Sequence, residues 1–279
     1  MDPHIAEALT PFVLTTRRNH QWLHLDAPLG MELSVFDIDE PAHSPFGLLL
    51  NYTNQLAFGG ETNMGMPLWV MLDCGIMPSA IVGFALPREV ISDRLRDELA
   101  VPDKYAGWVP VSEYCACPAL EPGCVSGFSL QSQLGGYGLG TRTKALALRI
   151  YGSTSQIGVT QFDNPSIRVH ARFGALEIMI HRPALHTHPR KSFSYRTQLP
   201  SYAVLEAMAR GEEAQTSELV GVDGRAFTFD PEEEAHHEML RAHLTMGKRA
   251  WIVPPGWRKD GERGVVEMVL ARRVTREGS

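Results

Sequence analysis

The chain has 279 residues, 44% of them hydrophobic, so it is long enough to bury a sizeable core in one large domain or in a domain with an appendage. Its 26 Lys and Arg residues stand against 32 Asp and Glu residues, which gives a net charge of −6. This balance excludes the basic field that draws a protein to nucleic acid or anionic lipid, so we expect neither as a partner.

The N-terminal segment and the cysteine content favour a cytoplasmic protein. The first residues, MDPHIAEALTPF, lack the basic and apolar regions of a secretion signal, and no later stretch approaches the roughly 20 apolar residues of a membrane span. Four cysteines are too few for a disulfide framework in a chain of this size. No close Cys or His pair has zinc spacing, so we predict no metal site.

The first half of the chain predicts alternating strands and helices. Residues 31–38 have the pattern of a strand, and residues 46–58 that of a helix packed on a sheet. Two apolar runs within residues 69–87, separated by a turn with Gly, Pro and Ser, predict a hairpin. Apolar residues at four-residue spacing predict an amphipathic helix over residues 89–100, and residues 108–117 alternate as a strand does.

A glycine cluster joins a predicted strand at residues 124–131 to a predicted helix at residues 141–151. The cluster consists of Gly135, Gly136, Gly138 and Gly140. Glycine lets the backbone approach a ligand closely, and the amide groups and positive dipole end of a helix N-terminus favour anions. The cluster therefore indicates a phosphate or diphosphate site, with a purely structural turn as the alternative.

The second half predicts further strands, helices and a final hairpin. Asn164 and Pro165 begin a short helix that Gly174 ends. Acidic residues after Asp230 mark the start of a later helix, which Gly247 ends. The other predicted elements are strands at residues 157–163, 175–180 and 193–199, a short helix at residues 202–210, and a hairpin from residue 249 onward.

Read as one piece, GFSLQSQLGGYGLGTRTKAL (residues 127–146) resembles the strand, loop and helix of the GNAT superfamily of acyl-CoA N-acyltransferases. The resemblance is to the branch that acetylates ribosomal-protein N-termini and related amines. Gly135 stands where this family usually has a cation, so that contact is missing or comes from Arg142 or Lys144. The residues that match are Gly127, Phe128 and Leu130 in the strand and Gly136, Gly138, Gly140 and Thr141 in the loop.

A second segment, DNPSIRVHARFGA (residues 163–175), resembles a later helix of the same family. In the family this helix holds a Tyr near the thiol of coenzyme A, and His170 occupies that position here. Several features depart from the family. The strand at residues 124–130 lacks the carboxylate that often serves as base. The helix at residues 89–100 interrupts strands that the family joins directly, and residues from 202 onward have no counterpart.

The resemblance implies a mixed α+β fold, with a GNAT-like, mostly antiparallel central sheet, flanking helices and a C-terminal α/β extension. It divides the chain into a GNAT-like acyltransferase domain of residues 1–200 and an extension of residues 201–279. The implied reaction is acyl transfer, with acetyl-CoA or another acyl-CoA as co-substrate and no metal. The acceptor would be a small-molecule or peptide amine, and a homodimer is left open.

The resemblance also implies roles for single residues. The amine attacks the thioester directly, backbone N–H groups hold the oxyanion, Glu113 is the candidate base, and His170 is the candidate proton donor to the departing thiolate. The strand before the glycine loop parts from its neighbour in this family and binds the pantetheine arm. The implied coenzyme-binding residues are Leu130, Gln131, Gly135, Gly136, Tyr137, Gly138, Leu139, Gly140, Thr141, Arg142 and Asn164.

Two alternatives stay open. Residues 144–150 and 166–173 also alternate as strands do, and a glycine turn before a lysine is similar to the barrel of acetoacetate decarboxylase, where a desolvated Lys144 would form a Schiff base. We prefer a helix after Asn164 because Asn and Pro begin it and Gly174 ends it. The other alternative is a non-catalytic domain that binds acyl-CoA or an acyl carrier protein.

Overall fold

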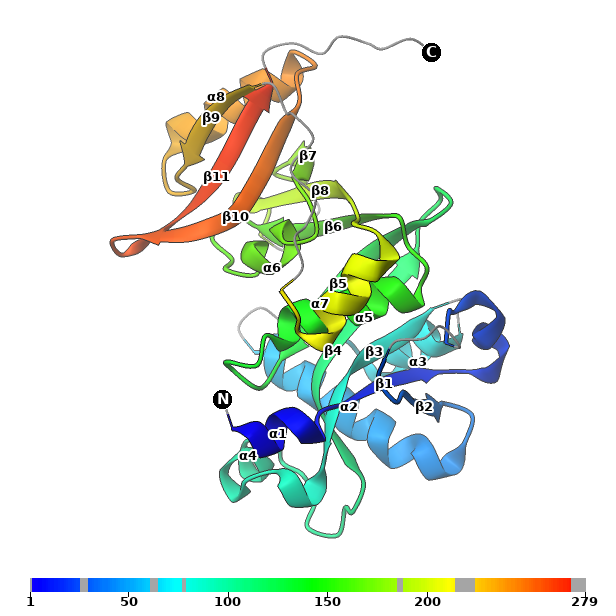
Figure 1. Cartoon of the computed structure of the whole chain (residues 1–279). Coiled ribbons are helices and arrows are strands. Elements are labelled where there is room, and N and C mark those ends of the chain that lie inside the picture. Colours follow the sequence, from blue (N-terminus) through cyan, green and yellow to red (C-terminus); the bar gives the residue numbers. More distant parts are fainter. Residues whose placement is uncertain are drawn as a thin grey trace. The chain divides into compact units, whose positions relative to one another are not determined.

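The computed structural model describes residues 2–25, 30–60, 65–76, 79–184, 188–213 and 224–271. The chain forms two compact units. Unit 1 comprises Met1–Ser153 and Tyr202–Ala214, and unit 2 comprises Thr154–Ser201 and Gln215–Ser279. Both units mix helices with strands that pair mostly in antiparallel fashion, so the predicted α+β class is confirmed (Figure 1).

The sheet of unit 1 places Glu113 in its interior. Within the described residues its strand order is β2-β1-β3-β4-β5, with β1 and β2 parallel and the other pairs antiparallel. One row across the sheet pairs Phe12 with Gly83, Gly83 with Glu113, and Glu113 with Gln131. The strands are β1 (Thr10–Thr15), β2 (Ser34–Asp37), β3 (Ala80–Pro87), β4 (Trp108–Pro118) and β5 (Cys124–Ser132).

One face of this sheet is covered by α2 (Ser44–Phe58) and α3 (Leu68–Ile76). At the start of α2, Phe46 packs edge-on against Phe12 of β1, with the ring centroids 4.9 Å apart. Near its end, Asn54 contacts β4 and β5. Helix α2 therefore crosses the strands, over an apolar half of the face at β1 and β3 and a polar half at β4 and β5.

The opposite face of the unit 1 sheet is covered by α5 (Leu139–Ile150), which packs beside α7 (Tyr202–Arg210) (Figure 1). Successive residues of a strand point to opposite faces, so Ser112 faces α5 while Glu113 faces α2. Ser112 Oγ lies 2.7 Å from Thr143 Oγ1. The shorter elements are α1 (Pro3–Ala8), η1 (Arg17–Trp22), η2 (Pro41–His43), η3 (Arg88–Val90) and α4 (Asp93–Glu98).

Unit 2 contains the remaining strands and an aromatic core of its own. In the described residues the strand order is β6-β8-β7-β10-β11-β9, and each neighbouring pair is antiparallel. Phe162, Phe193, Tyr195 and Phe229 lie at the centre of the core. The elements are β6 (Ser155–Gln161), α6 (Ile167–Ala171), β7 (Leu176–His181), β8 (Ser192–Gln198), β9 (Gly224–Phe229), α8 (Glu234–Thr245), β10 (Ala250–Asp260) and β11 (Arg263–Ala271).

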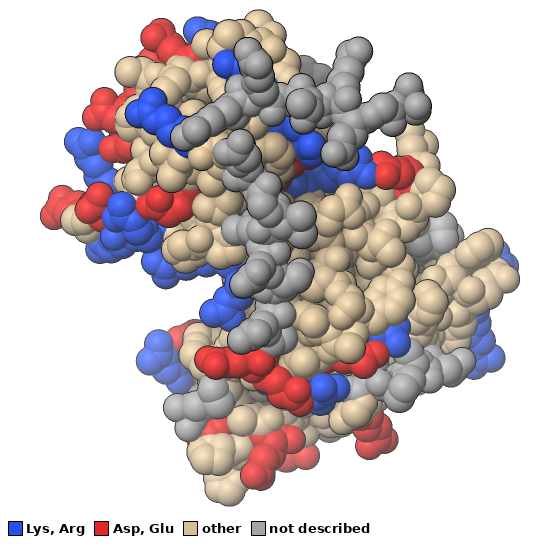
Figure 2. All heavy atoms as spheres, turned by 45° about the horizontal axis from the view of Figure 1, so that its top comes forward, with Lys and Arg blue, Asp and Glu red and all other residues tan. Residues whose placement is uncertain are grey.

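The surface carries charged side chains of both signs, as the composition of the chain leads us to expect (Figure 2). Basic and acidic side chains are interspersed on the face that Figure 2 shows. Among the described residues, no helix has both the length and the apolar character that crossing a bilayer requires.

Most predicted elements are confirmed, but the N-terminal part needed correction. The hairpin predicted at residues 69–87 is wrong, because its first half is helix α3 and only its second half, β3, is a strand. A short apolar run does not distinguish a buried helix from a strand by its pattern. Strand β1 was not predicted because it contains Pro11, which normally argues against a strand. The parallel β1–β2 register begins only at Phe12, so this proline breaks no bond there.

Two predicted helices begin later than expected. The helix predicted over residues 89–100 is limited to α4, whose first turn is capped by Ser92. The helix expected after Asp230 begins at Glu234, because the Asp230 carboxylate accepts a hydrogen bond from Glu232 N at 2.9 Å and forms a turn instead. The predicted division at residue 200 concerns the end of a family domain. The two compact units reflect contacts within the chain, so this division stays a prediction.

The strand interpretation of residues 144–150 and 166–173 is wrong. The first segment lies in α5 and the second contains α6. The barrel alternative required extended chain around Lys144, which instead lies on a buried helix.

Candidate functional site

Gly135, Gly136 and Gly138 form the turn between β5 and α5, as predicted, whereas Gly140 already lies in the first turn of α5. Gly136 and Gly138 have φ angles of +85° and +65°, which favour glycine. Gly138 is the N-cap residue of α5, and no side chain in the described part of the chain caps this helix. A Cβ atom built at Gly135, Gly136 or Gly138 would meet no described heavy atom within 4 Å. Neither packing against described atoms nor a positive φ therefore requires glycine at 135.

The first turn of α5 is anchored to the rest of unit 1. Leu139 is buried, and the amides of Thr141 and Arg142 both donate to Gly138 O at 3.0 Å. The side chain of Arg142 donates from Nε to Ala209 O at 3.1 Å and lies 4.7 Å from the centroid of the Phe84 ring. Burial lowers the pKa of Arg142. These contacts bind Arg142 to α7 and β3.

Other predicted coenzyme-binding residues have structural contacts of their own. Tyr137 accepts a hydrogen bond from Asp2 N at its hydroxyl, at 3.2 Å. Lys144, an alternative cation for the loop, is completely buried, and burial lowers its pKa well below the ordinary value. In unit 2, Asn164 Oδ1 accepts from Ser166 N at 2.8 Å in the turn before α6. The binding roles of these residues stay predictions.

The candidate base, Glu113, is completely buried on β4. Its Oε1 atom accepts hydrogen bonds from Asn54 Nδ2 and, at 3.2 Å, from Ser129 Oγ. Its Oε2 atom has no hydrogen-bond partner among the described residues. Burial raises the pKa of Glu113 to about 7, although the polar side chains of Asn54, Ser129 and Gln131 beside it oppose this rise. The carboxyl group can therefore exchange a proton near neutral pH.

Polar side chains lead from Glu113 towards the glycine turn. Gln131 is the cross-strand partner of Glu113, and its Nε2 atom donates to Thr53 Oγ1 at 3.4 Å. Gln133, at the start of the turn, donates from Nε2 to Gln131 Oε1 at 3.0 Å. The neighbouring Leu130 alternates to the other side of β5. The amide side chains of Gln131 and Gln133 thus form a polar path from the strand position beside Glu113 to the glycine turn.

The candidate proton donor, His170, lies in unit 2. It is buried on α6, and its ring centroid is 5.5 Å from that of Tyr195. Glu113 belongs to unit 1, whereas His170 belongs to unit 2. Their joint action therefore stays a prediction.

Asn54 is the site residue that the sequence analysis missed. It is 1% exposed and contacts both Glu113 and Ser129. Its position gave a signal, because it lies on the buried face of α2 four residues after Leu50 and eight after Phe46. A polar residue in that row indicates a buried partner.

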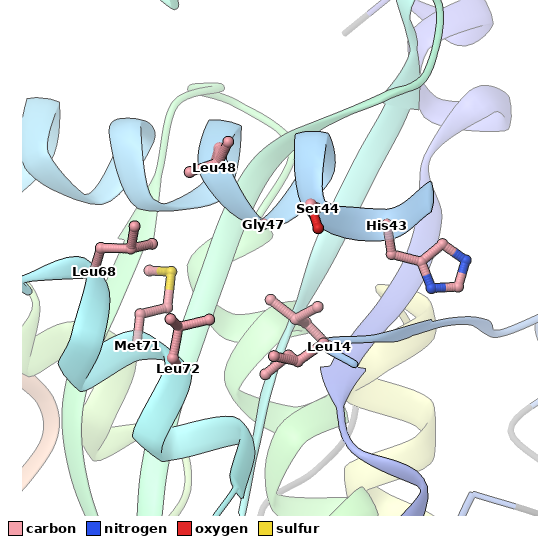
Figure 3. A pocket seen from close by; sticks show the side chains of 9 residues that line it. Leu14, His43, Ser44, Gly47, Leu48, Leu68, Met71 and Leu72 are labelled. Atoms are coloured by element: carbon pink, nitrogen blue, oxygen red, sulfur yellow. The ribbon is translucent and has the colours of Figure 1, made fainter. Parts of the chain in front are cut away.

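An apolar pocket lies near the start of α2 (Figure 3). It has a volume of about 200 Å³, and Figure 3 shows side chains of α3 and Leu14 below α2. Of its lining residues, His43 and Ser44 bring polar groups, and His43 Nδ1 already accepts a hydrogen bond from Asp37 N at 2.9 Å. Apart from these two residues, the described lining consists of glycine and apolar side chains.

Among the described residues, no group of three or more His, Cys, Asp or Glu side chains is arranged to hold a metal ion. No model of a known protein family matches the chain, and no curated protein sequence matches it. The assignment of function therefore rests on the chemistry of the residues themselves.

Proposed function

We propose that the protein is an acyl-CoA-dependent N-acyltransferase that transfers an acetyl or other acyl group to an amine. The observation that carries this proposal is the glycine turn before α5, where the helix lacks a side-chain cap and Gly135 has no packing reason to be glycine. Backbone amides at such a helix terminus suit a diphosphate, which presents several acceptor oxygens and negative charge. The resemblance of residues 127–146 and 163–175 to the GNAT superfamily supports the same ligand.

The proposed roles follow from the contacts of each residue. Acetyl-CoA supplies an activated thioester when it is bound. The loop residues Gly135, Gly136 and Gly138 offer space for the diphosphate next to the amides of α5. Glu113 accepts the proton of the amine, because its pKa of about 7 lets it be ionised at neutral pH and still basic enough to take a proton. His170 holds the proton that the departing thiolate needs.

A non-catalytic acyl-CoA-binding domain would need the glycine turn but no buried base. Burying a carboxyl group with one oxygen unpartnered among the described residues is costly for the fold. Groups that are held in such costly states concentrate at catalytic sites. Glu113 therefore favours an enzyme over a binding domain.

The test is to incubate the purified protein with acetyl-CoA and a panel of small amines and N-terminal peptides, and to detect acylated products by mass spectrometry. We expect transfer to at least one amine class, and a loss of turnover of about 10²- to 10⁴-fold in Glu113→Gln. The His170→Ala variant should also lose turnover with little change in coenzyme binding. Absence of transfer from acetyl-, propionyl- and longer acyl-CoA donors to the whole panel would refute the proposal.

A further inference from the structure

Asn54 lies at the centre of a buried hydrogen-bond network that joins α2, β4, β5 and the segment before α3. Its Nδ2 atom donates to Glu113 Oε1 and, at 3.1 Å, to Ser129 Oγ. Its Oδ1 atom accepts from Met66 N at 2.7 Å. All the hydrogen-bonding groups of the amide thus have defined partners in the interior of unit 1.

These partners determine which way the Asn54 amide points. A backbone N–H group can only donate, so Met66 N requires the oxygen of the amide, and Nδ2 must face Glu113. Ser129 Oγ also donates to the same carboxyl oxygen, Oε1. Oε1 therefore receives two hydrogen bonds, whereas Oε2 receives none from the described residues.

We propose that Asn54 is a positioning residue that holds the carboxyl group of Glu113 with Oε1 bonded and leaves the buried Oε2 as the oxygen that takes up the proton. This inference rests on the proposed function for the role of Glu113 as a base. The same amide group links Glu113 Oε1 to Met66 N, since it donates to the first and accepts from the second.

The groups that face Glu113 from the neighbouring elements are neutral. Asn54 faces it from α2, Ser129 and Gln131 face it from β5, and Gly83 on β3 has no side chain. Among the described residues, no charged group acts on the pKa of Glu113, and the hydrogen bond from Asn54 is the one that lowers this pKa most. Loss of the Asn54 donor should therefore raise the pH at which Glu113 gives up its proton.

Asn51 provides a matched control. It also lies on α2 and also binds Met66, through a hydrogen bond from Nδ2 to Met66 O at 2.8 Å. Asn51→Asp and Asn54→Asp remove the same donor group, add the same charge and keep nearly the same volume. Of these two asparagines, Asn54 is the one that bonds to Glu113.

The experiment follows the carboxyl C=O stretching band of Glu113 by infrared spectroscopy against pH, with the band assigned by its loss in Glu113→Gln. We expect a protonated carboxyl band in Asn54→Asp to persist to a pH about one unit or more above that of the wild type, because two adjacent carboxyl groups retain a proton. The band in Asn51→Asp should titrate as in the wild type. If Asn54→Asp does not fold, Asn54→Ser removes the same amide donor without adding charge. The protonated carboxyl band should then again persist to a higher pH than in the wild type.

The pH profile of kcat/KM separates this inference from the proposed function. A purely structural role of Asn54 would lower kcat/KM without moving its acid limb, whereas positioning moves the limb upward with the infrared band. An unmoved band in a folded Asn54 variant, or acyl transfer with an unmoved acid limb, would overturn the inference. A shifted band in a protein that transfers no acyl group would support the hold of Asn54 on Glu113 and refute the acyltransferase proposal.

Discussion

At the scale of single residues, Gly83 determines how closely β3 and β4 pack beside Glu113. It pairs with Glu113 in the sheet, and a Cβ atom built on it would clash with Ser112 O and lie 2.7 Å from Phe12 Cε1. Both neighbours are in the interior and have little freedom to move. Glycine is therefore required here by packing, in contrast to Gly135.

We expect Gly83→Ala to lower the free energy of unfolding by about 3 kcal/mol, because the added methyl group overpacks the strand pair. Gly135→Ala is the control and should change this free energy by less than about 0.5 kcal/mol, since its Cβ meets no described atom within 4 Å. Urea unfolding measures both variants. A cost below about 1 kcal/mol for Gly83→Ala would mean that β3 and β4 are spaced more widely than the structure shows.

Glu113 gives a second prediction, on the pH dependence of stability. Its pKa is about 7 in the folded protein against 4.5 for the free side chain, so between these pH values the folded state binds more protons than the unfolded state. Stability from this group is fully present below pH 4.5 and is lost as the pH rises to 7. The loss is about 3 kcal/mol for a shift of this size.

The Glu113→Gln variant lacks this titration. Its free energy of unfolding should therefore rise relative to that of the wild type as the pH rises from 4.5 to 7.5. Urea midpoints at a series of pH values measure the difference between the two proteins. Parallel pH profiles for the wild type and the variant would show that Glu113 titrates normally.

At the scale of elements, an ion pair joins α5 to α7 in unit 1. Arg149 Nε lies 2.7 Å from Glu206 Oε1, and their side chains are only 9% and 20% exposed. The guanidinium group also lies 4.9 Å from the centroid of the Tyr202 ring. Removing one partner would leave the other charge buried and unpaired, which is costly.

We expect Glu206→Ala to lower the free energy of unfolding by about 3 kcal/mol, because Arg149 then loses its carboxylate. The control is Glu98→Ala in α4, whose partner Arg94 is 87% exposed, and it should cost less than about 0.5 kcal/mol. Thermal or urea unfolding checks both. Equal costs for the two variants would mean that the α5–α7 pair is effectively solvated.

The strand, glycine turn and helix over residues 124–150 were predictable because local signals agree there: alternation, then glycines, then an apolar face of helical spacing. The Glu113 network was predictable only in part. Glu113 was named as a candidate base, but its bond to Asn54 joins residues 59 positions apart and depends on how α2 crosses the sheet. Helix α3 was missed because a short apolar run has the same pattern in a buried helix as in a buried strand.

At the scale of the whole molecule, the buried Glu113 of unit 1 and the half-buried His181 of unit 2 respond to acid in opposite ways. In unit 2, His181 Nε2 lies 2.9 Å from His237 Nδ1, beside the aromatic core. The pKa of His181 is lowered to about 4, first by burial and then by the charges of His237, Arg182 and Arg241, while Glu234 opposes this. Its ordinary value is 6.5, so stability from this group is present above pH 6.5 and is lost as the pH falls to 4.

We therefore expect acidification from pH 6.5 to 4.5 to stabilise unit 1 through Glu113 and to destabilise unit 2 through His181. Hydrogen exchange, corrected for intrinsic rates, should show slower exchange in β4 and β5 and faster exchange in β7 and β8. His181→Gln should reduce the acid sensitivity of unit 2 only. Parallel changes in both units would contradict the separate titration of the two groups.

We propose that the glycine turn before α5 binds the diphosphate of an acyl-CoA. Calorimetric titration with acetyl-CoA and desulfo-CoA measures this binding directly. We expect both coenzymes to bind the wild type, and Gly135→Val to bind at least about tenfold more weakly because its side chain occupies the space of the ligand. The control Gly60→Val, whose Cβ also meets no described atom within 4 Å, should bind as the wild type does. A folded wild-type protein that binds neither coenzyme, or a Gly135→Val variant with unchanged affinity, would contradict the account.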